Sequence, residues 1–235
     1  MSGHLEVSDL QVHFGQAQIL QGVGLSVAGA PLSVVGRNGM GKTTMCNALM
    51  GMVPASGSVR LDGDEILGLG TGRIARRGVA LVPQGRRMFP SLSVHEHLLL
   101  VAQRGNPPWN IDRVYATFPR LAERRRNGGD QLSGGEQQML AIARALLMNP
   151  KLVIMDEPSE GLAPVIVDHL IEVLRGIAAE GTGLLLIEQN LRVATAVAEQ
   201  VAIMVTGRIA ATVSGAELAR DREMQNRYLG VSHGH

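Results

Sequence analysis

The sequence predicts an α/β fold built around a mainly parallel sheet, and three observations support this prediction. A glycine-rich loop at 36–44, GRNGMGKTT, comes directly after the apolar run Leu32–Val35. In the C-terminal part of the chain, helix-like and strand-like segments alternate. The apolar run at 152–156 ends beside two adjacent carboxylates. This alternation is typical of a parallel sheet that binds ligands at the carboxyl ends of its strands.

The N-terminal part of the chain has the pattern of β-strands, because short apolar stretches there are separated by glycines and Pro31. A helix is predicted from Lys42 to near Gly51, since Pro54 follows shortly after. The predicted strands are Leu5–Val7, Ile19–Val27, Leu32–Val35, Val59–Leu61 and Val79–Val82.

The pattern becomes helix-like from about Val94 to Gln131, with a break at 105–108 and a loose charged end at 123–129. We interpret this region, about 90–148, as a helical subdomain inserted into the α/β core. The core would comprise about 1–84 and 150–235, so that 1–235 forms a single domain. The alternating elements are helices at 134–148, 164–180 and 190–199 and strands at 152–156, 183–187 and 201–205.

Composition restricts the possible partners. With 235 residues the chain can bury a large core, and its formal net charge of +1 argues against nucleic acid as a partner. The single cysteine, Cys46, excludes an internal disulfide, and the N-terminus lacks a secretion signal, so a cytoplasmic location is expected. No apolar window approaches the ~20 residues needed to cross a bilayer. Any connection to a membrane is therefore expected to run through a partner.

The loop at 36–44 matches the phosphate-binding pattern G-x4-G-K-[ST]. Glycines at 36, 39 and 41 allow the backbone to turn tightly and to bring N–H groups against phosphate oxygens. Lys42 is expected to reach the β- and γ-phosphates and Thr43 to ligate Mg²⁺, while the following helix adds the positive end of its dipole. The loop predicts a site for a nucleoside triphosphate.

A second motif, LSGGEQQ, occupies 132–138. Ser133 and Glu136 form a capping box for the helix that follows, which is a sufficient structural explanation for both. Gly134 and Gly135, however, each destabilise a helix by roughly 1 kcal/mol relative to alanine. They become useful if this helix end must approach an anion closely.

A third motif lies at the end of the buried-type strand 152–156. Asp156 is placed to hold the Mg²⁺ shell, and Glu157, on the opposite face of the strand end, is suited to orient or deprotonate the attacking water. By itself the pair would be only a strand running into a turn.

With these three motifs in this order, the chain resembles the ATP-binding subunits of ABC transporters along nearly its whole length. The resemblance implies a P-loop NTPase fold of the ABC cassette type, with an N-terminal antiparallel β subdomain and an inserted helical subdomain. Further stretches resemble the ATPases of branched-chain amino acid and urea or amide importers: VPQGRRMFPSLSVHEHL at 82–98, DEPSEGLAP at 156–164, LLIEQN at 185–190 and RYLGV at 227–231.

The resemblance also implies a head-to-tail dimer, in which LSGGE of one chain closes over ATP held by the other. Gln84 would contact Mg²⁺ and water and relay the nucleotide state to the transmembrane subunits. Phe14 would stack on adenine, although an ordinary core phenylalanine is the alternative. The expected nucleotide-binding residues are Phe14, Gly36, Arg37, Asn38, Gly39, Met40, Gly41, Lys42, Thr43, Thr44, Gln84, Ser133, Gly134 and Gly135. The expected metal ligands are Thr43, Gln84 and Asp156, and the expected catalytic residues are Glu157, Gln189 and Lys42.

The chain departs from the family pattern at two positions. Gln189 stands where the family at large carries a histidine, and a glutamine amide can donate to the γ-phosphate but cannot carry a proton. Ala163 stands where many relatives have aspartate. Both departures are usual in the branched-chain group.

These features predict the ATP-hydrolysing subunit of an ABC importer for branched-chain amino acids, with ATP and Mg²⁺ as cofactors. Its expected partners are transmembrane permease subunits, a second ATP-binding subunit of the same or a related kind and, indirectly, a solute-binding protein. It would lie peripherally at the cytoplasmic face of the membrane. The alternatives are a urea or short-amide importer, a soluble ABC-type ATPase and a nucleotide-gated module with negligible turnover. Glu157 argues against the last of these.

Other residues carry weaker expectations. His95 and His97 are expected to be solvated or capping, and Cys46 to be a small buried hydrophobe. His233 and His235 are expected to lie on a disordered surface. The apolar segment Met88, Phe89, Pro90 and Leu92 would either form a groove for a helix of the membrane subunit or pack beneath the helical subdomain.

Overall fold

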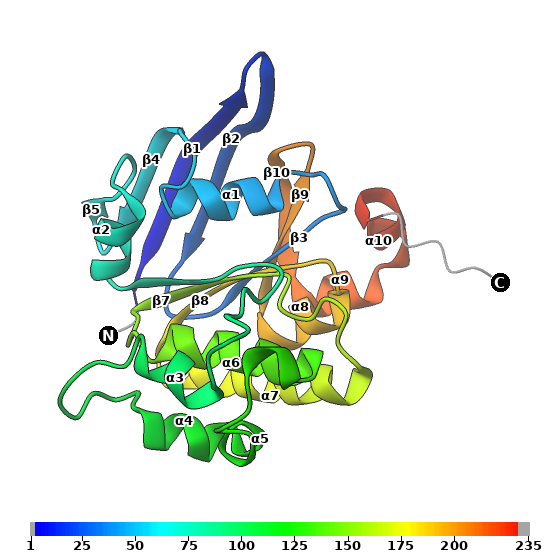
Figure 1. Cartoon of the computed structure of the whole chain (residues 1–235). Coiled ribbons are helices and arrows are strands. Elements are labelled where there is room, and N and C mark those ends of the chain that lie inside the picture. Colours follow the sequence, from blue (N-terminus) through cyan, green and yellow to red (C-terminus); the bar gives the residue numbers. More distant parts are fainter. Residues whose placement is uncertain (1–2, 230–235) are drawn as a thin grey trace.

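The computed structural model describes residues 3–229, which fold into two sheets with helices between and below them (Figure 1). The smaller sheet is antiparallel with the order β2-β1-β4-β5. Its strands are β1 (Leu5–Phe14), β2 (Ala17–Val27), β4 (Ser56–Leu61) and β5 (Asp64–Glu65). The larger sheet has the order β10-β9-β3-β8-β7-β6. Its strands are β3 (Leu32–Val35), β6 (Val79–Val82), β7 (Leu152–Asp156), β8 (Gly183–Glu188), β9 (Gln200–Val205) and β10 (Arg208–Ser214).

All neighbouring pairs in the larger sheet are parallel except β10, which pairs antiparallel with β9. The prediction of a mainly parallel sheet is therefore confirmed. The described helices are α1 (Lys42–Leu49), α2 (Thr71–Arg76), α3 (Val94–Leu99), α4 (Ile111–Thr117), α5 (Pro119–Glu123), α6 (Gly134–Leu146), α7 (Pro164–Ala179), α8 (Leu191–Val197), α9 (Gly215–Arg220) and α10 (Arg222–Leu229), with a short 3₁₀ turn at Gly129–Gln131.

Helix α1 lies between the two sheets (Figure 1). Its buried Met45, Cys46 and Leu49 share one hydrophobic cluster with residues of both sheets. Cys46 is 1% exposed and has no disulfide partner, as expected from the sequence. Because α1 is covered on both sides, the loop that precedes it is held on a rigid base.

Strand β7 is buried on both faces, and its side chains alternate between two cores. Leu152 and Ile154 face the cluster that contains α1, whereas Val153 and Met155 face the cluster of α6 and α7. A strand covered on both sides is expected to be apolar along its length, and β7 is apolar from Leu152 to Met155 before it ends at Asp156.

Helices α3, α4 and α5 come from the region that the sequence assigns to a helical subdomain, and α3 and α5 pack on α6. Their buried Val94, Leu98 and Leu121 belong to the same hydrophobic cluster as Val153 of the sheet. The hydrophobic core is thus continuous from these helices to the sheet, so the boundary of a separate subdomain at about 90–148 stays a prediction.

The structure differs from the sequence predictions at β1, which is longer than Leu5–Val7 because its pairing with β2 continues past a β-bulge to Phe14. Asp9 has a φ of 49°, and the register with β2 shifts between Val7 and Leu10. The bulge breaks the alternation of apolar and polar residues. The residues that face Asp9 from the neighbouring strands are glycines. A Cβ at Gly57 of β4 would lie 2.3 Å from the Asp9 carbonyl oxygen, and one at Gly22 of β2 would lie 2.8 Å from Asp9 Oδ1.

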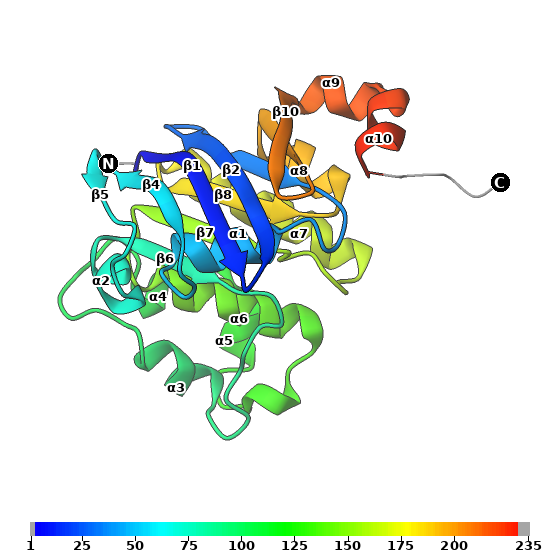
Figure 2. The same cartoon turned by 90° about the horizontal axis from the view of Figure 1, so that it is seen from above.

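Strand β10 and helices α9 and α10 were not predicted, and they lie together at one end of the larger sheet (Figure 2). Strands β9 and β10 are joined by Thr206 and Gly207, with φ of 45° and 74°, as a two-residue hairpin requires. The expectations for Gly230, Val231, His233 and His235 concern residues outside the described part of the chain.

Candidate functional site

The predicted site elements meet at one edge of the larger sheet, because β3, β6, β7 and β8 are parallel neighbours. The glycine-rich loop follows β3, and Asp156 ends β7. Val35 pairs with Glu188, so Gly36 and Gln189 leave the sheet side by side. The segments that follow β3, β6, β7 and β8 therefore converge at the carboxyl edge of the sheet, where ligands were expected.

A cavity of about 280 Å³ lies at this edge. Its lining residues come from β2, the glycine-rich loop, α1, the segment after β6 and the turn after β7: Ile19, Asn38, Gly39, Gly41, Lys42, Thr43, Thr44, Gln84 and Glu157. All but Ile19 were predicted as site residues. Gly36, Arg37 and Met40 of the same loop are not among the described residues that line the cavity.

Glycine is required at two positions of the loop by the backbone conformation and at the third by close packing. Gly39 and Gly41 have φ of 81° and 100°, which side chains rarely adopt. Gly36 has no such φ, but a Cβ there would lie 2.6 Å from the Met204 carbonyl oxygen. Gly36 therefore permits close packing on β9 rather than contact with a ligand. Helix α1 has no side-chain cap at its N-terminus, so its first backbone N–H groups remain available as donors.

Lys42 is buried at the base of the cavity and all three of its hydrogen-bonding positions are used. Its Nζ donates to the carbonyl oxygens of Gly36 at 2.7 Å and Arg37 at 3.1 Å, and it lies 3.0 Å from Glu157 Oε1. The ammonium is thus fixed in position, and the Glu157 carboxylate is the group that balances its charge.

Asp156 has the properties of a metal ligand. Burial raises the pKa of its carboxyl group, a hydrogen bond with the Thr43 side chain acts in the opposite direction, and its Oδ1 is buried without a hydrogen-bond partner. Within residues 3–229 there is no cluster of three or more His, Cys, Asp or Glu side chains that could hold a metal. One carboxylate, a hydroxyl and the Gln84 amide oxygen suit Mg²⁺, which usually takes few protein ligands and completes its shell with phosphates and water.

Glu157 begins a tight turn and has a left-handed backbone, with φ of 49°. Its N–H donates to the Ile187 carbonyl oxygen at 2.9 Å, which ties the start of the turn to β8. The side chain points to Lys42, so the predicted catalytic carboxylate and the predicted phosphate ligand are in direct contact.

Glu160, which was not among the predicted site residues, binds the segment after β6 to this turn. Gln84 Nε2 donates to Glu160 Oε2 at 2.8 Å, and Arg86 donates to the Glu160 carbonyl oxygen at 3.1 Å. Because the Gln84 amide group donates to Glu160, its oxygen is left to face a metal or water. The second glutamate of DEPSEG was the available signal, but its partner is more than seventy residues distant in the chain.

The capping box predicted at α6 is present. Ser133 Oγ accepts from the Glu136 N–H at 3.3 Å, and Glu136 Oε2 accepts from the Ser133 N–H at 2.9 Å. A Cβ at Gly135 would lie 2.9 Å from Ile166 Cγ2, and one at Gly134 would lie 2.7 Å from Arg86 Nη1. Packing within the chain thus accounts for part of the glycine requirement. None of Ser133, Gly134 and Gly135 is among the described residues that line the cavity around Lys42.

Two further predicted residues, Phe14 and Gln189, are not among the described residues that line the cavity. Phe14, at the end of β1, is 50% exposed, so the alternative of an ordinary core phenylalanine is wrong, and stacking on adenine stays a prediction. Gln189 is exposed directly after β8.

The expectation of a solvated or capping role is wrong for His97. Its ring is fully buried, its Nε2 accepts from the Phe89 N–H at 2.9 Å, and its Nδ1 lies 2.9 Å from the Ser93 carbonyl oxygen. His97 therefore supports the loop before α3. His95 contacts the Tyr115 hydroxyl at 3.0 Å.

Comparisons with known proteins agree with this geometry. The sequence pattern of the ABC transporter family matches residues 20–160. The chain is 38% identical over 231 residues to BraG of Pseudomonas aeruginosa, a high-affinity branched-chain amino acid transport ATP-binding protein, covering 96% of this chain and 99% of BraG. It is 31% identical over 233 residues to LptB of Escherichia coli strain K12, a lipopolysaccharide export system ATP-binding protein, covering 96% and 97% of the two chains.

A solved ATP-binding cassette of an ABC transporter, in its ADP conformation, superposes with a TM-score of 0.81 over 98% of this chain and 100% of that one, at 24% identity. In the described part of the chain, no helix combines the length and apolar character that crossing a membrane requires. The family match and the two relatives together show that the chain belongs to the ABC transporter family, as an ATP-hydrolysing subunit that binds ATP and powers transport.

Proposed function

We propose that this chain powers an importer for branched-chain amino acids. The observation that supports this solute is the higher identity to the branched-chain relative than to the lipopolysaccharide relative, over nearly the full length of both. Export of a lipid and import of urea or a short amide are the competing functions. The solute is selected outside this chain, so its identity is to be tested by transport.

The proposed hydrolysis follows from the three contacts of Lys42. An incoming triphosphate would take the place of one of them, and the Glu157 carboxylate is the contact that can leave without unfolding the loop. Glu157 then becomes free to accept a hydrogen bond, and finally a proton, from the attacking water. Gln189 would donate its amide N–H to the γ-phosphate. Phosphoryl transfer depends mainly on such positioning and on charge compensation.

Thr43, Asp156 and Gln84 would hold Mg²⁺, which when bound supplies positive charge to the phosphate oxygens. The unpartnered Asp156 Oδ1 supports this role, because a buried carboxylate oxygen without a donor is costly unless it meets a cation or water. Thr43 lines the cavity, and its side chain acts to lower the pKa of the Asp156 carboxyl group, which supports a shared role of the two oxygens at one ion.

We further propose that the chain works as a head-to-tail dimer. The capping box at α6 uses the N–H groups of Ser133 and Glu136, but the N–H groups of Gly134 and Gly135 lie in the first turn, where a helix supplies no acceptor. These groups do not face the chain's own cavity, which supports a role on the nucleotide of a partner subunit. The partner would be a second copy or a related ATPase.

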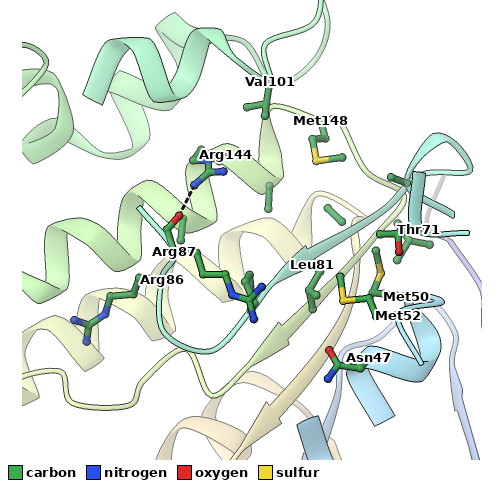
Figure 3. Close-up of a pocket in the computed structure, with 16 residues that line it drawn as sticks. Asn47, Met50, Met52, Thr71, Leu81, Arg86, Arg87, Val101, Arg144 and Met148 are labelled. Atoms are coloured by element: carbon green, nitrogen blue, oxygen red, sulfur yellow. Dashed lines mark hydrogen bonds between the residues drawn. The ribbon is translucent and has the colours of Figure 1, made fainter. Parts of the chain in front are cut away.

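A second cavity, of about 290 Å³, supports docking of a permease helix. Figure 3 shows Val101 and Met148 on one side and Met50, Met52 and Leu81 on the other. Arg144 closes one end, where it donates to the Arg87 carbonyl oxygen at 3.2 Å. The groove thus adjoins the segment that carries Gln84, so a helix seated there could sense the nucleotide.

The apolar segment for which a groove or packing beneath the helical subdomain was expected, Met88, Phe89, Pro90 and Leu92, is not part of this cavity. Met88 packs against the main core, and Phe89 is 50% exposed beside His97. Neither lines the cavity, nor do Pro90 and Leu92, among the described residues. The residues that line the groove next to Gln84 are Arg86 and Arg87 instead.

The role of Glu157 is tested with Glu157→Gln in the assembled ATPase. We expect hydrolysis to fall by about a thousandfold and an ATP-bound dimer to persist in size-exclusion chromatography, since an amide cannot accept the proton. Glu172→Gln on α7, whose side chain is 80% exposed, is the matched control and should behave like the parent. Normal hydrolysis by Glu157→Gln would show that the base lies elsewhere.

The solute is tested by deleting the gene in its own organism and measuring uptake of labelled leucine and labelled urea. Loss of leucine uptake alone, restored by the intact gene and not by Glu157→Gln, is the expected result. Loss of urea uptake alone would favour the amide importer, and unchanged uptake of both would contradict the import proposal.

A further inference from the structure

Glu188 is a buried carboxylate that the mechanism above does not use. It ends β8 directly before Gln189 and is only 1% exposed. Carboxylates are rarely buried to this degree without a specific set of hydrogen-bond donors. Burial raises the pKa of Glu188, while hydrogen bonds from the side chain and backbone of Ser159 act in the opposite direction.

The carboxylate joins two loops that meet at the carboxyl edge of the sheet. Its Oε1 accepts from the Ser159 N–H at 3.0 Å, in the turn after β7. Its Oε2 accepts from the N–H groups of Gln189 and Asn190, both at 3.2 Å, in the loop after β8. Each oxygen thus serves a different loop.

The turn held by Oε1 carries Glu157, whose left-handed φ of 49° is sparsely populated for residues with a side chain. Such a conformation persists only where the surrounding structure fixes it. The Glu157 N–H is bonded to the Ile187 carbonyl, and the Ser159 N–H is bonded to Glu188. Two consecutive residues of β8 therefore fix the turn on both sides of Pro158.

We propose that Glu188 is a positioning residue, which ties the turn bearing Glu157 to the backbone of Gln189 so that both side chains face the γ-phosphate in a fixed relation. The proposal rests on the catalytic role proposed for Glu157. A displacement of either group alone would misalign water and phosphate, and misplacement by about 1 Å can reduce a rate by about 10²-fold.

The chemistry of this position requires a carboxylate. Glutamine has the same length, but one of its two terminal atoms is an NH₂ group that would face backbone N–H donors. Aspartate keeps both acceptors but is one methylene shorter, so it cannot span the same two loops. Glu188→Gln therefore removes one of the two attachments and leaves the packing volume almost unchanged.

The experiment measures kcat and KM for ATP of Glu188→Gln in the full assembled ATPase. We expect kcat to fall by about 10²-fold while KM for ATP stays within about twofold, because the phosphate loop follows β3 and makes no hydrogen bond to Glu188. If this variant does not fold, Glu188→Asp is measured in the same way and must show the same division between kcat and KM.

Glu65 provides a matched control. Its carboxylate accepts from the N–H groups of Val59 at 2.8 Å and Leu67 at 3.1 Å and from the Ser58 hydroxyl, far from the site in the antiparallel sheet. Glu65→Gln makes the same chemical change in a purely structural setting. It should lower the melting temperature and leave kcat unchanged.

A double-mutant cycle separates positioning from general destabilisation. Gln189→Ala should lower kcat in the parent but cause little further loss in Glu188→Gln, since the two changes affect one alignment. A folded Glu188 variant with the parent's kcat, or additive effects of the two changes, would overturn the proposal. Failure of the Glu157 role is seen separately, as hydrolysis retained by Glu157→Gln.

Discussion

Helices α1 and α6 both begin in a glycine-rich segment, but their N-termini are completed in opposite ways. At α1 the N-cap is Gly41, no side chain caps the helix, and its first turn contains no acidic residue. At α6 the N-cap is Ser133, and a full capping box with Glu136 is formed within the chain. One helix end is left open to a ligand, and the other is already stabilised.

The charges around the two helix ends follow the same division. At α1, buried Lys42 and Glu157 are 3.0 Å apart and compensate each other in the site itself. At α6, Glu136 Oε1 lies 3.6 Å from Arg120 and 3.7 Å from Arg124 at the surface. A triphosphate at α1 must therefore rearrange a buried ion pair, whereas an anion at α6 meets backbone donors without disturbing the cap.

Among the variants that compare these helix ends, Lys42→Met is expected to have the largest effect. It should lower affinity for ATP and reduce hydrolysis more than 100-fold, and it leaves Glu157 buried without its cation, which costs about 3 kcal/mol of unfolding free energy. Titration with a fluorescent ATP analogue, an ATPase assay and urea unfolding measure the three effects. Lys151→Met, which removes a surface ion pair with Asp62, is the control and should leave ATP affinity, the rate of hydrolysis and the unfolding free energy almost unchanged.

The α6 end is tested with Ser133→Ala. Hydrolysis by the dimer should fall about tenfold, because the helix end that we propose to close on the partner's nucleotide loses its hydroxyl, and stability should fall by about 1 kcal/mol. Binding of ADP to the isolated chain should be unaffected, since Ser133 does not line the chain's own cavity.

Ser93→Ala gives the matched control for this prediction. Ser93 and Glu96 form the same capping box at α3, with Ser93 Oγ accepting from the Glu96 N–H at 3.3 Å. This variant should lose a similar amount of stability and keep its kcat. If Ser93→Ala lowered kcat as much as Ser133→Ala, the loss at α6 would reflect stability alone.

Replacing the carboxylates of Asp156 and Glu136 by amides should change the unfolding free energy in opposite directions. Burial raises the pKa of Asp156, so its charge destabilises the folded chain above that pKa, and the penalty disappears as the pH falls through it. Asp156→Asn should therefore gain about 1 kcal/mol of unfolding free energy at pH 8 without nucleotide or metal. It should also lose Mg²⁺-dependent hydrolysis.

Glu136 behaves in the reverse manner. Burial alone would raise its pKa, but hydrogen bonds from Ser133 and the nearby arginines outweigh burial and lower it. Its contribution is present above the unfolded pKa and is lost as the pH falls through the folded pKa. Glu136→Gln should thus be less stable at pH 7 and approach the parent in acid. Unfolding curves between pH 2.5 and 8 measure the stability of both variants, and a change of the same sign in Asp156→Asn and Glu136→Gln at pH 8 would contradict the contrast.

The smallest effect is expected at a third helix end, that of α7. Ala163 is its N-cap and offers no side-chain hydrogen bond. Ala163→Asp should raise the unfolding free energy by about 1 kcal/mol and the melting temperature by about 2–4 °C, because its side chain can cap α7. Ala163→Leu, which cannot cap, is the control and should give no gain in a thermal melt.

The predictable parts of this molecule were those set by short sequence spacing. The glycine-rich loop, the Ser133 capping box and the buried strand before Asp156 each depend on residues a few positions apart. The bulge at Asp9 was not predictable, because it depends on glycines in two neighbouring strands. The turn at Thr206 and Gly207 was visible as a hairpin signal that the sequence analysis did not use.

The contacts of Glu160 and Glu188 could not be read from the sequence for a different reason. Glu160 meets Gln84, and Glu188 meets Ser159, only because β6, β7 and β8 become neighbours in the folded sheet. Order along the chain does not specify which strands become neighbours, so residues that join loops across strands remain unassigned until the topology is known.

Cys46, enclosed between the two sheets directly behind the phosphate loop, is a built-in probe of local opening. The chain contains one cysteine, and burial raises the pKa of its thiol, so a thiol reagent can react only when this layer separates. The labelling rate then measures the lifetime of the closed layer at a single position. A nucleotide bound at the adjacent loop would slow labelling, which allows occupancy to be followed without an assay of phosphate release.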